Sequence, residues 1–228
     1  MLTSFADDIW IADGSDLSVM GFTYPTRCAV MRLQRGDLLV WSPIALHDVL
    51  KAQIDALGTV SHLIAPNMFH HMFLSEWQAA YPKARLYGLS GLHSKRSDLR
   101  FNGVLGDDPD AAWANQIDQI VLNNNLTDEV VFFHQLSRTV IFTDLIQQFS
   151  TGFHTGWRGV IARLDLMVGD IPNVPRKFRL GFRNKAKARA SVEKVLDWPI
   201  ERVLLAHGTP VTADGHAVLK RTFHWLIG

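Results

Sequence analysis

Five side chains of types that bind transition metals stand where apolar segments of the sequence end. They are His70, His71, His134, Asp144 and His207. A lone histidine is more often a packed or surface residue than a ligand, so the recurrence at four segment ends carries the inference. Imidazole and carboxylate groups suit zinc, iron or manganese, and the single cysteine, Cys28, excludes a Cys-rich zinc site. The pattern predicts a metal site of nitrogen and oxygen ligands at the strand ends of an α/β fold.

The stretch before His70 and His71 has the pattern of a buried strand followed by a turn. Residues 63–65 are an apolar run, Pro66 and Asn67 break it, and residues 68–80 have a helical pattern. Adjacent residues of a regular strand face opposite sides, so both imidazoles can reach one site only from a turn or a helix start. We therefore expect such a turn at the carboxyl end of this strand.

Two polar side chains near the expected ligands are candidates for substrate binding. Asn67, beside the histidine pair, could donate a hydrogen bond to a developing oxyanion, although an asparagine after a proline is also ordinary turn chemistry. Arg138, between two expected ligands, could bind a carboxylate or phosphate group, or it could pair with a surface acid. Both alternatives stay open for each residue.

The elements expected around these residues form two strand-rich sections, each followed by helices. Strands are expected at residues 8–12, 28–33, 38–42, 63–65, 84–88, 117–122, 130–133, 139–143 and 202–206. Helices are expected at residues 45–57, 68–80, 147–149, 157–168, 184–198 and 214–226. In the helix expected at residues 157–168, residues 160, 161, 164 and 167 share one apolar face. Residues 91–105 are polar and are expected to be an irregular surface excursion. The order predicts two mixed sheets packed face to face, with helices on their outer faces.

Composition narrows the class of protein. The chain has 228 residues, of which 47% are hydrophobic, and a formal net charge of +1, which together favour one α/β domain over residues 1–228 and argue against a nucleic-acid partner. The one strong charge run, residues 176–189, permits an anion-binding surface but is more often a solvated helix face. No signal peptide or membrane span is recognised, so the protein is expected to be cytoplasmic and without a membrane partner. A homo-oligomer is left open.

Five segments of the sequence resemble the metallo-β-lactamase-fold hydrolases, and they occur in the right order. They are LLVWSP (residues 38–43), LIAPNMFHH (63–71), YPKA (81–84), FFHQLSRTVIFTD (132–144) and LLAHG (204–208). Within this superfamily, the chain looks most like a poorly characterised branch known only as a domain of unknown function. The resemblance covers nearly the whole chain and implies a four-layer αββα sandwich of two mixed β-sheets.

The resemblance also implies a ligand set, with one departure from the superfamily. Its His-x-His-x-Asp-His motif falls on residues 66–71, where Pro66 and Met68 replace the two leading histidines and His70 replaces the aspartate. One of the superfamily's two metal positions therefore keeps too few ligands. The other implies a single divalent metal, with zinc expected first and iron or manganese as alternatives. Its implied ligands are His70, His71, Asp144 and His207, with His134 nearby as an extra ligand or as a partner of a ligand.

The chemistry that this site implies is hydrolysis. A single metal with an open position activates water and polarises a carbonyl or phosphoryl oxygen. The expected catalytic residues are Asp144 and either His70 or His134, one of which orients or deprotonates the water. The expected substrate is a small ester, lactone, thioester or phosphoester. The alternative is a degenerate, non-catalytic member that keeps a structural metal or none and binds a ligand or a protein partner.

Overall fold

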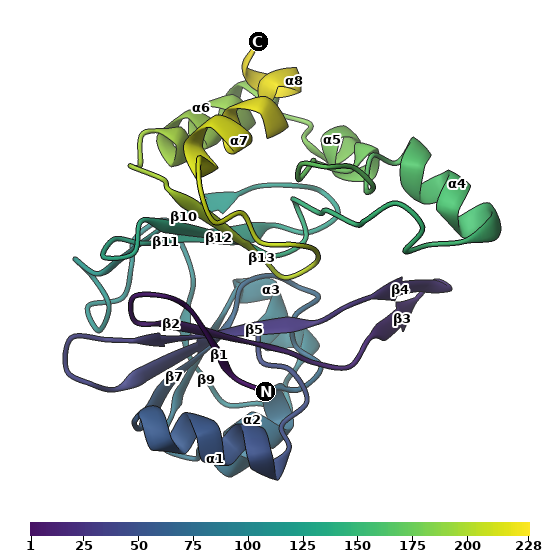
Figure 1. The fold of residues 1–228 in the computed structure, drawn as a ribbon. Coiled ribbons are helices and arrows are strands. Elements are labelled where there is room, and N and C mark those ends of the chain that lie inside the picture. The colour runs from purple at the N-terminus through teal and green to yellow at the C-terminus, as the bar shows by residue number, and fades with distance from the viewer.

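Two β-sheets face each other in the computed structural model, which describes residues 1–228 (Figure 1). The first sheet has seven strands, in the order β1 (Thr3–Ala6), β2 (Ile9–Asp13), β5 (Arg27–Arg32), β6 (Leu38–Trp41), β7 (Val60–Ala65), β8 (Arg85–Gly88) and β9 (Phe101–Val104). The second has four strands, in the order β10 (Ile117–Leu122), β11 (Glu129–His134), β12 (Thr139–Phe142) and β13 (Arg202–Leu205). In the first sheet β6 to β9 run parallel and the other pairs antiparallel, and in the second only β12 and β13 run parallel. Both sheets are mixed, as predicted.

Helices cover the outer face of each sheet (Figure 1). On the first sheet, α1 (Asp48–Leu57), α2 (Leu74–Ala80) and α3 (Ser90–Lys95) share one buried apolar cluster with the strands. On the second sheet, α6 (Lys185–Leu196), α7 (Gly215–Thr222) and α8 (His224–Ile227) share another. A third cluster, which includes Trp41, Phe132 and Ile141, lies between the sheets. The predicted αββα sandwich is confirmed, and none of its helices combines the length and apolar character that a membrane crossing requires.

Strand β6 illustrates why this sequence forms a sandwich. All four of its residues are apolar and fully buried. Leu39 and Trp41 belong to the cluster between the sheets, whereas Leu38 and Val40 belong to the cluster under the helices. A strand that is covered on both faces is expected to be a continuous apolar run rather than an alternating one. The LLVW segment therefore indicates a central strand.

A hairpin and a short helix project beyond the four layers at one end (Figure 1, right). The hairpin consists of β3 (Leu17–Val19) and β4 (Phe22–Tyr24), and the helix is α4 (Gly156–Leu164). The two contact each other where Arg158 Nε donates to the Gly21 carbonyl over 2.6 Å and where the rings of Phe22 and Trp157 meet edge to face. We call β3, β4 and α4 the hairpin lobe. Another short helix, α5 (Arg176–Gly181), lies between this lobe and α6 along the chain.

Several segments differ from the sequence-based expectations, and local contacts explain three of these differences. Residues 91–105, expected to be irregular, contain most of α3 and all of β9, and β9 forms because β8 offers an edge at which it can pair. Residues 147–149, expected to be helical, are extended, because Gln147 exchanges both backbone hydrogen bonds with Asn173. Helix α2 begins at Leu74 rather than at residue 68, because the N–H groups of His71 and Leu74 donate to the carbonyls of Phe69 and His71 in tight turns instead of reaching four residues back.

Several cations of the basic run at residues 176–189 are engaged within the fold. The Nζ atom of Lys177 lies 3.5 Å from an oxygen of Asp165. Arg179 donates to the carbonyl of Val174, and Arg189 donates to the carbonyl of Leu226. These contacts favour a structural role for the run over a nucleic-acid surface.

Candidate metal centre

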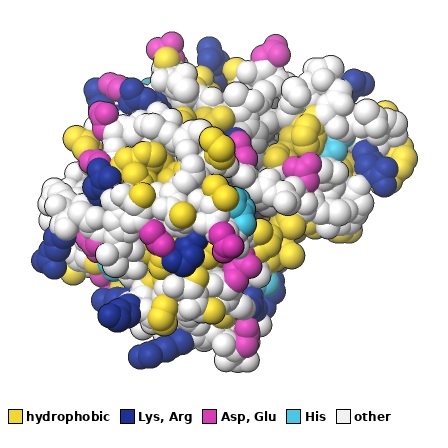
Figure 2. Space-filling view, turned by 60° about the horizontal axis from the view of Figure 1, so that its bottom comes forward, with side chains coloured by type: hydrophobic (Ala, Val, Ile, Leu, Met, Phe, Trp, Pro, Cys, Tyr) yellow, Lys and Arg dark blue, Asp and Glu magenta, His cyan; other side chains and the backbone are white.

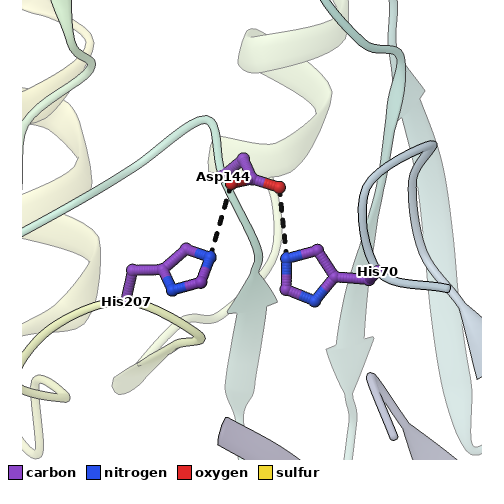
Figure 3. A group of neighbouring side chains, drawn as sticks. All are labelled: His70, Asp144 and His207. Carbon is purple, nitrogen blue, oxygen red and sulfur yellow. Dashed lines mark ion pairs between the residues drawn. The ribbon is translucent and has the colours of Figure 1, made fainter. Parts of the chain in front are cut away.

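Three titratable side chains meet where strands of both sheets end (Figure 3). His70 comes from the turn after β7, while Asp144 and His207 follow β12 and β13. The Oδ2 atom of Asp144 is 3.2 Å from His70 Nε2, and its Oδ1 atom is 3.4 Å from His207 Nε2. One ligand atom from each residue lies within 4.8 Å of the other two. The structure thus brings together three of the five side chains that the sequence suggested as ligands.

Strand direction explains why these three residues meet. Because β12 and β13 are parallel, with Phe142 beside Leu205, the residues that follow them emerge at the same edge. Asn67, just after β7, forms a bridge with Glu129, the first residue of β11. The carboxyl end of β7 therefore lies at this edge as well, as expected for ligand sites at strand ends.

The Nδ1 atom of each imidazole, which points away from Asp144, has a hydrogen-bond partner that fixes the tautomer of the ring. His207 Nδ1 is 2.7 Å from the Pro25 carbonyl, which can only accept, so Nδ1 carries the hydrogen. Ser42 Oγ donates to the Arg27 carbonyl over 3.1 Å and lies 2.7 Å from His70 Nδ1, so it accepts from that nitrogen. In the neutral form of each ring, the lone pair is then on Nε2 and faces Asp144. This orientation of both rings is typical of metal-binding histidines.

Charge at this site favours a bound cation. Burial alone would raise the pKa of Asp144, but its contacts with His70 and His207 outweigh burial and hold the pKa well below its usual range. Burial likewise would lower the pKa of His207, whereas its hydrogen bond to Asp144 raises it. An ionised carboxylate that faces two nitrogen lone pairs is stable only if a proton or a metal ion lies between them. Two imidazoles and one carboxylate are a common ligand set for catalytic zinc and for non-haem iron, so the residues present fit a divalent metal.

Asn67 ties the turn that carries His70 to Asp144. Its side-chain nitrogen donates to Asp144 Oδ2 over 2.6 Å and to Thr143 Oγ1 over 3.1 Å. Its side-chain oxygen accepts from the backbone N–H groups of Phe69 and His70. Asn67 is fully buried, and both of its amide hydrogens are used. The expectation that it donates to an oxyanion does not fit this geometry, and Asn67 is instead a positioning residue.

Glu129 is a site residue that the sequence analysis missed. It is fully buried and accepts three backbone N–H groups: Thr143 at Oε1 over 2.7 Å, and Asp144 and Leu145 at Oε2 over 2.8 and 3.0 Å. Burial and the neighbouring charge of Asp144 raise the pKa of Glu129. The carboxyl group therefore holds the backbone that presents Asp144. The only sequence signal is an acid directly before the apolar run of β11, where burial would be costly without partners.

His71 does not join the other two histidines. Its Nδ1 is 3.2 Å from Arg96 Nη1, which also donates to the His71 carbonyl over 2.6 Å. Burial lowers the pKa of His71, and the charges of Lys95 and Arg96 lower it further. Because its ring nitrogen already accepts from a guanidinium group, we do not place His71 among the metal ligands. The adjacent residues of the turn point in different directions, and only His70 faces Asp144.

His134 and Arg138 lie at the edge of the second sheet opposite to the one at which Asp144 and His207 emerge. Strand β11 is antiparallel to β12, so His134 pairs with Thr139 at the start of β12, whereas Asp144 follows the end of β12. The His134 ring contacts Ser137 Oγ over 2.8 Å instead. Arg138 donates to the Pro199 carbonyl and to Glu201, as its surface-pair alternative predicted. The structure therefore does not bring His134 or Arg138 to the group formed by His70, Asp144 and His207.

A cavity of about 920 Å³ opens beside the three side chains. His70, Asp144 and His207 form part of its lining, and most of the remaining lining is apolar. Most of these apolar residues come from the hairpin lobe and from the turn after β7, and the others follow β6, precede β11 or lie in or just before α5. The volume lies within the range typical of small-molecule sites. A small molecule can therefore reach the candidate metal centre.

Removing the hydroxyl group that orients His70 should weaken metal binding. We expect Ser42→Ala to lower zinc affinity about 10-fold to 100-fold, because the imidazole loses the partner that fixes its tautomer. Alanine is preferred over glycine because Ser42 has a φ of +53° and glycine would also free the backbone. Ser61→Ala is the matched control, since Ser61 Oγ contacts the remote His62 ring over 2.7 Å. Equal zinc affinities in a chelator-competition titration would contradict the proposed role of Ser42.

The residue after His207 must be glycine for a steric reason. Gly208 has a φ of +132°, and a Cβ atom there would collide with the backbone of Gln148. We expect Gly208→Ala to lower the free energy of unfolding by about 2 kcal/mol or more and to weaken metal binding through displacement of His207. Gly152→Ala is the control, because Gly152 has a φ of +90° with nothing within 4 Å. Equal losses in urea unfolding would mean that backbone strain alone matters.

Comparison with known proteins agrees with this architecture. Residues 6–154 match a family model described as a domain of unknown function, DUF4336, and no curated protein matches the sequence. The DIM-1 metallo-β-lactamase exposed to ceftazidime is 14% identical, with a TM-score of 0.67 over 100% of this chain and 95% of its own. The mono-zinc form of FIM-1 from Pseudomonas aeruginosa is 11% identical, with a TM-score of 0.63 over 99% of this chain and 95% of its own.

A protein with a different description shares the same fold. The metal-soaked Flv1 flavodiiron core from Synechocystis sp. PCC6803 is 13% identical, with a TM-score of 0.67 over 100% of this chain and 60% of its own. At such identities the similarity concerns the fold, which is known to support several chemistries. The family model covers well over half of the chain. The protein therefore has the metallo-β-lactamase fold and belongs to the DUF4336 family of domains of unknown function.

Proposed function

We propose that this protein is a metal-dependent hydrolase of small esters, lactones, thioesters or phosphoesters. Its metal would be a single divalent ion held by His70, Asp144 and His207. The observation that carries the proposal is the convergence of two imidazole Nε2 atoms on one ionised carboxylate. The Nδ1 atom of each ring has a hydrogen-bond partner that fixes the orientation of the ring. The mono-zinc form of FIM-1 supports the idea that a protein of this fold can hold one metal.

The ligand number is suited to catalysis. Three protein ligands leave at least one position open, whereas a structural zinc site usually has four protein ligands. When bound, the metal would supply Lewis-acid activation of water and of the substrate carbonyl or phosphoryl oxygen. In ester hydrolysis the water oxygen bonds to the carbonyl carbon, the bond to the ester oxygen breaks, and the products are an acid and an alcohol. Asp144 and the two histidines would hold the metal, and the carboxylate of Asp144 would compensate part of its charge.

Neither ring nitrogen of His70 is free to act as a base, so another group must orient the water. Gln147 is 99% buried, lines the cavity and donates through Nε2 to the Asp144 carbonyl over 3.2 Å. Its Oε1 has no hydrogen-bond partner in the protein. A buried acceptor without a partner is costly, which favours a ligand or water there. Because Oε1 is covered, we infer that rotation of the Gln147 side chain exposes this oxygen to accept a hydrogen bond from the attacking water or from the substrate.

The test is reconstitution followed by a substrate screen. Protein stripped with a chelator is loaded with zinc, iron(II) or manganese(II) and assayed with an ester, a lactone, a thioester and a phosphoester. We expect at least one metal to restore hydrolysis in wild type and in His224→Ala, an exposed-histidine control. We expect none to restore it in His207→Ala. Stoichiometric metal binding without turnover of any substrate class would contradict the proposal.

The non-catalytic alternative has one specific observation in its favour. Pro66 and Met68 stand where the superfamily has its leading histidines, so a second metal position lacks those ligands. Loss of one metal removes a source of transition-state stabilisation but leaves the open position of the other. Metal retention without turnover in the screen would support this alternative.

A further inference from the structure

Helix α4 exposes an apolar stripe, although the apolar face of a helix usually packs on the core. Trp157, Val160, Ile161 and Leu164 are 57%, 54%, 43% and 60% exposed, although they follow the spacing of one helix face. The buried face consists of small residues instead, and a Cβ on Gly159 would come within 2.5 Å of the His154 carbonyl. Space-filling Figure 2 shows hydrophobic side chains exposed on the lobe at its right. The helix thus turns its larger apolar side chains away from the core.

Part of this stripe belongs to the cavity beside the metal centre. Trp157 and Ile161 line the cavity, whereas Val160 and Leu164 do not. Val19 of the hairpin and Met72 of the turn after β7 are also in the lining, although they are 50% and 57% exposed. Apolar side chains exposed together around a hollow mark a ligand site, because water is a poor occupant of such surfaces.

Away from the metal centre, the cavity lining has no uncompensated charge that could bind a charged ligand. Apart from Asp144 and the histidines, its charged residues are Lys177 and Asp165, which lie 3.5 Å apart and compensate each other. Lys177 also lies over the Tyr24 ring and donates to its hydroxyl group. The part of the ligand that extends from the metal centre should therefore be uncharged and apolar.

We propose that this cavity binds the alkyl chain of a single-chain ester or thioester, whose carbonyl group lies at His70, Asp144 and His207. The assignment of the substrate class rests on the proposed hydrolysis, whereas binding of the chain does not. Each methylene group buried in the cavity strengthens binding by a similar increment. Chain length should thus control affinity even in a protein that cannot turn the ester over.

Binding is measured first in Asp144→Asn, which should lack turnover. Isothermal titration calorimetry with the methyl esters of butanoic, hexanoic and octanoic acid should give affinities that rise about fourfold for each added methylene group. Methyl esters are uncharged, so the trend reports the apolar chain. Equal affinities for the three esters, or no binding of any, would overturn the proposal.

Neighbouring residues of α4 provide a matched pair of variants. Ile161→Ser should weaken binding of methyl octanoate about fivefold, because it removes apolar area from the lining. Val160→Ser should leave affinity unchanged, since Val160 is similarly exposed but outside the cavity. Both positions are solvent-exposed, so the fold should tolerate serine. Equal weakening by both variants would mean that the ester binds to the outer stripe of α4, which would overturn the assignment to the cavity.

The same series separates this inference from the proposed hydrolase function. With metal-loaded wild type, kcat/KM for p-nitrophenyl esters should rise from acetate to octanoate. A chain-length trend in binding without hydrolysis would retain the alkyl-chain cavity and reject the hydrolase. Hydrolysis that is independent of chain length would retain the hydrolase and reject the cavity assignment.

Discussion

Replacing Asp144 with asparagine is expected to lower affinity for zinc about 100-fold or more. Even partners of metal ligands contribute 10-fold to 100-fold to affinity, and Asp144 is the only carboxylate among the three proposed ligands. The substitution keeps the shape of the side chain but removes the negative charge that both Nε2 atoms face over 3.2 and 3.4 Å. The measurement is competition with a chromophoric chelator.

A second aspartate in the cavity lining is the control for this substitution. Asp165 lies near Lys177 rather than near the two histidines. Asp165→Asn changes the total charge by the same amount as Asp144→Asn, so it accounts for long-range electrostatics. We expect its zinc affinity to remain within a factor of two or so of wild type. Similar losses in both variants would show that zinc responds to overall charge rather than to ligation.

Replacing Glu129 with glutamine should destabilise the protein by about 2–4 kcal/mol, because at least one buried N–H group loses its acceptor. The carboxyl group accepts three N–H groups through its two oxygens. A glutamine has one oxygen, and its NH₂ group would face an N–H donor on the other side. The measurement is the free energy of unfolding from urea titration.

The exposed Glu193 of α6 provides the comparison for Glu129. Glu193→Gln makes the same chemical change without a buried partner and should alter stability by less than about 0.5 kcal/mol. If the two variants unfold with equal free energies, the N–H groups of residues 143–145 do not depend on Glu129. Metal affinity should also fall in Glu129→Gln, since the backbone of Asp144 loses its support.

The sandwich could be predicted because its central strands have a strong sequence signal. The apolar runs of β6, β7 and β12 are buried on both faces, and the turn residues between them limit the possible connections. The edge strand β9 and the β3–β4 hairpin were missed because their pairing partners, rather than their own composition, stabilise them. A single domain over residues 1–228 stays a prediction.

The site was only partly predictable, because strand direction decides which strand ends meet. His134 and His207 both follow apolar runs, but β11 is antiparallel to β12 whereas β13 is parallel to it. Their side chains therefore emerge at opposite edges of the sheet. Glu129 begins β11 and reaches the site that His134 was expected to reach. The pattern of apolar runs gives no strand direction, so it could not separate these two ends.

Helix α4 shows a limit of hydrophobic periodicity. Its spacing correctly indicates an amphipathic helix, but periodicity does not say which face packs on the core. Gly159 and Ala162 permit close approach of the helix, and the larger residues remain outside, where two of them line the cavity. An apolar face can therefore serve a ligand rather than the core.

The most direct test of the proposed centre is X-ray absorption spectroscopy of the protein loaded with one equivalent of zinc. His70, Asp144 and His207 predict a shell of two imidazole nitrogens and a carboxylate oxygen at about 2.0–2.2 Å, completed by water. Multiple scattering from two imidazole rings would identify the histidines, and it should fall to one ring in His207→Ala. A shell with no imidazole contribution, or one that is unchanged in His207→Ala, would contradict the metal centre.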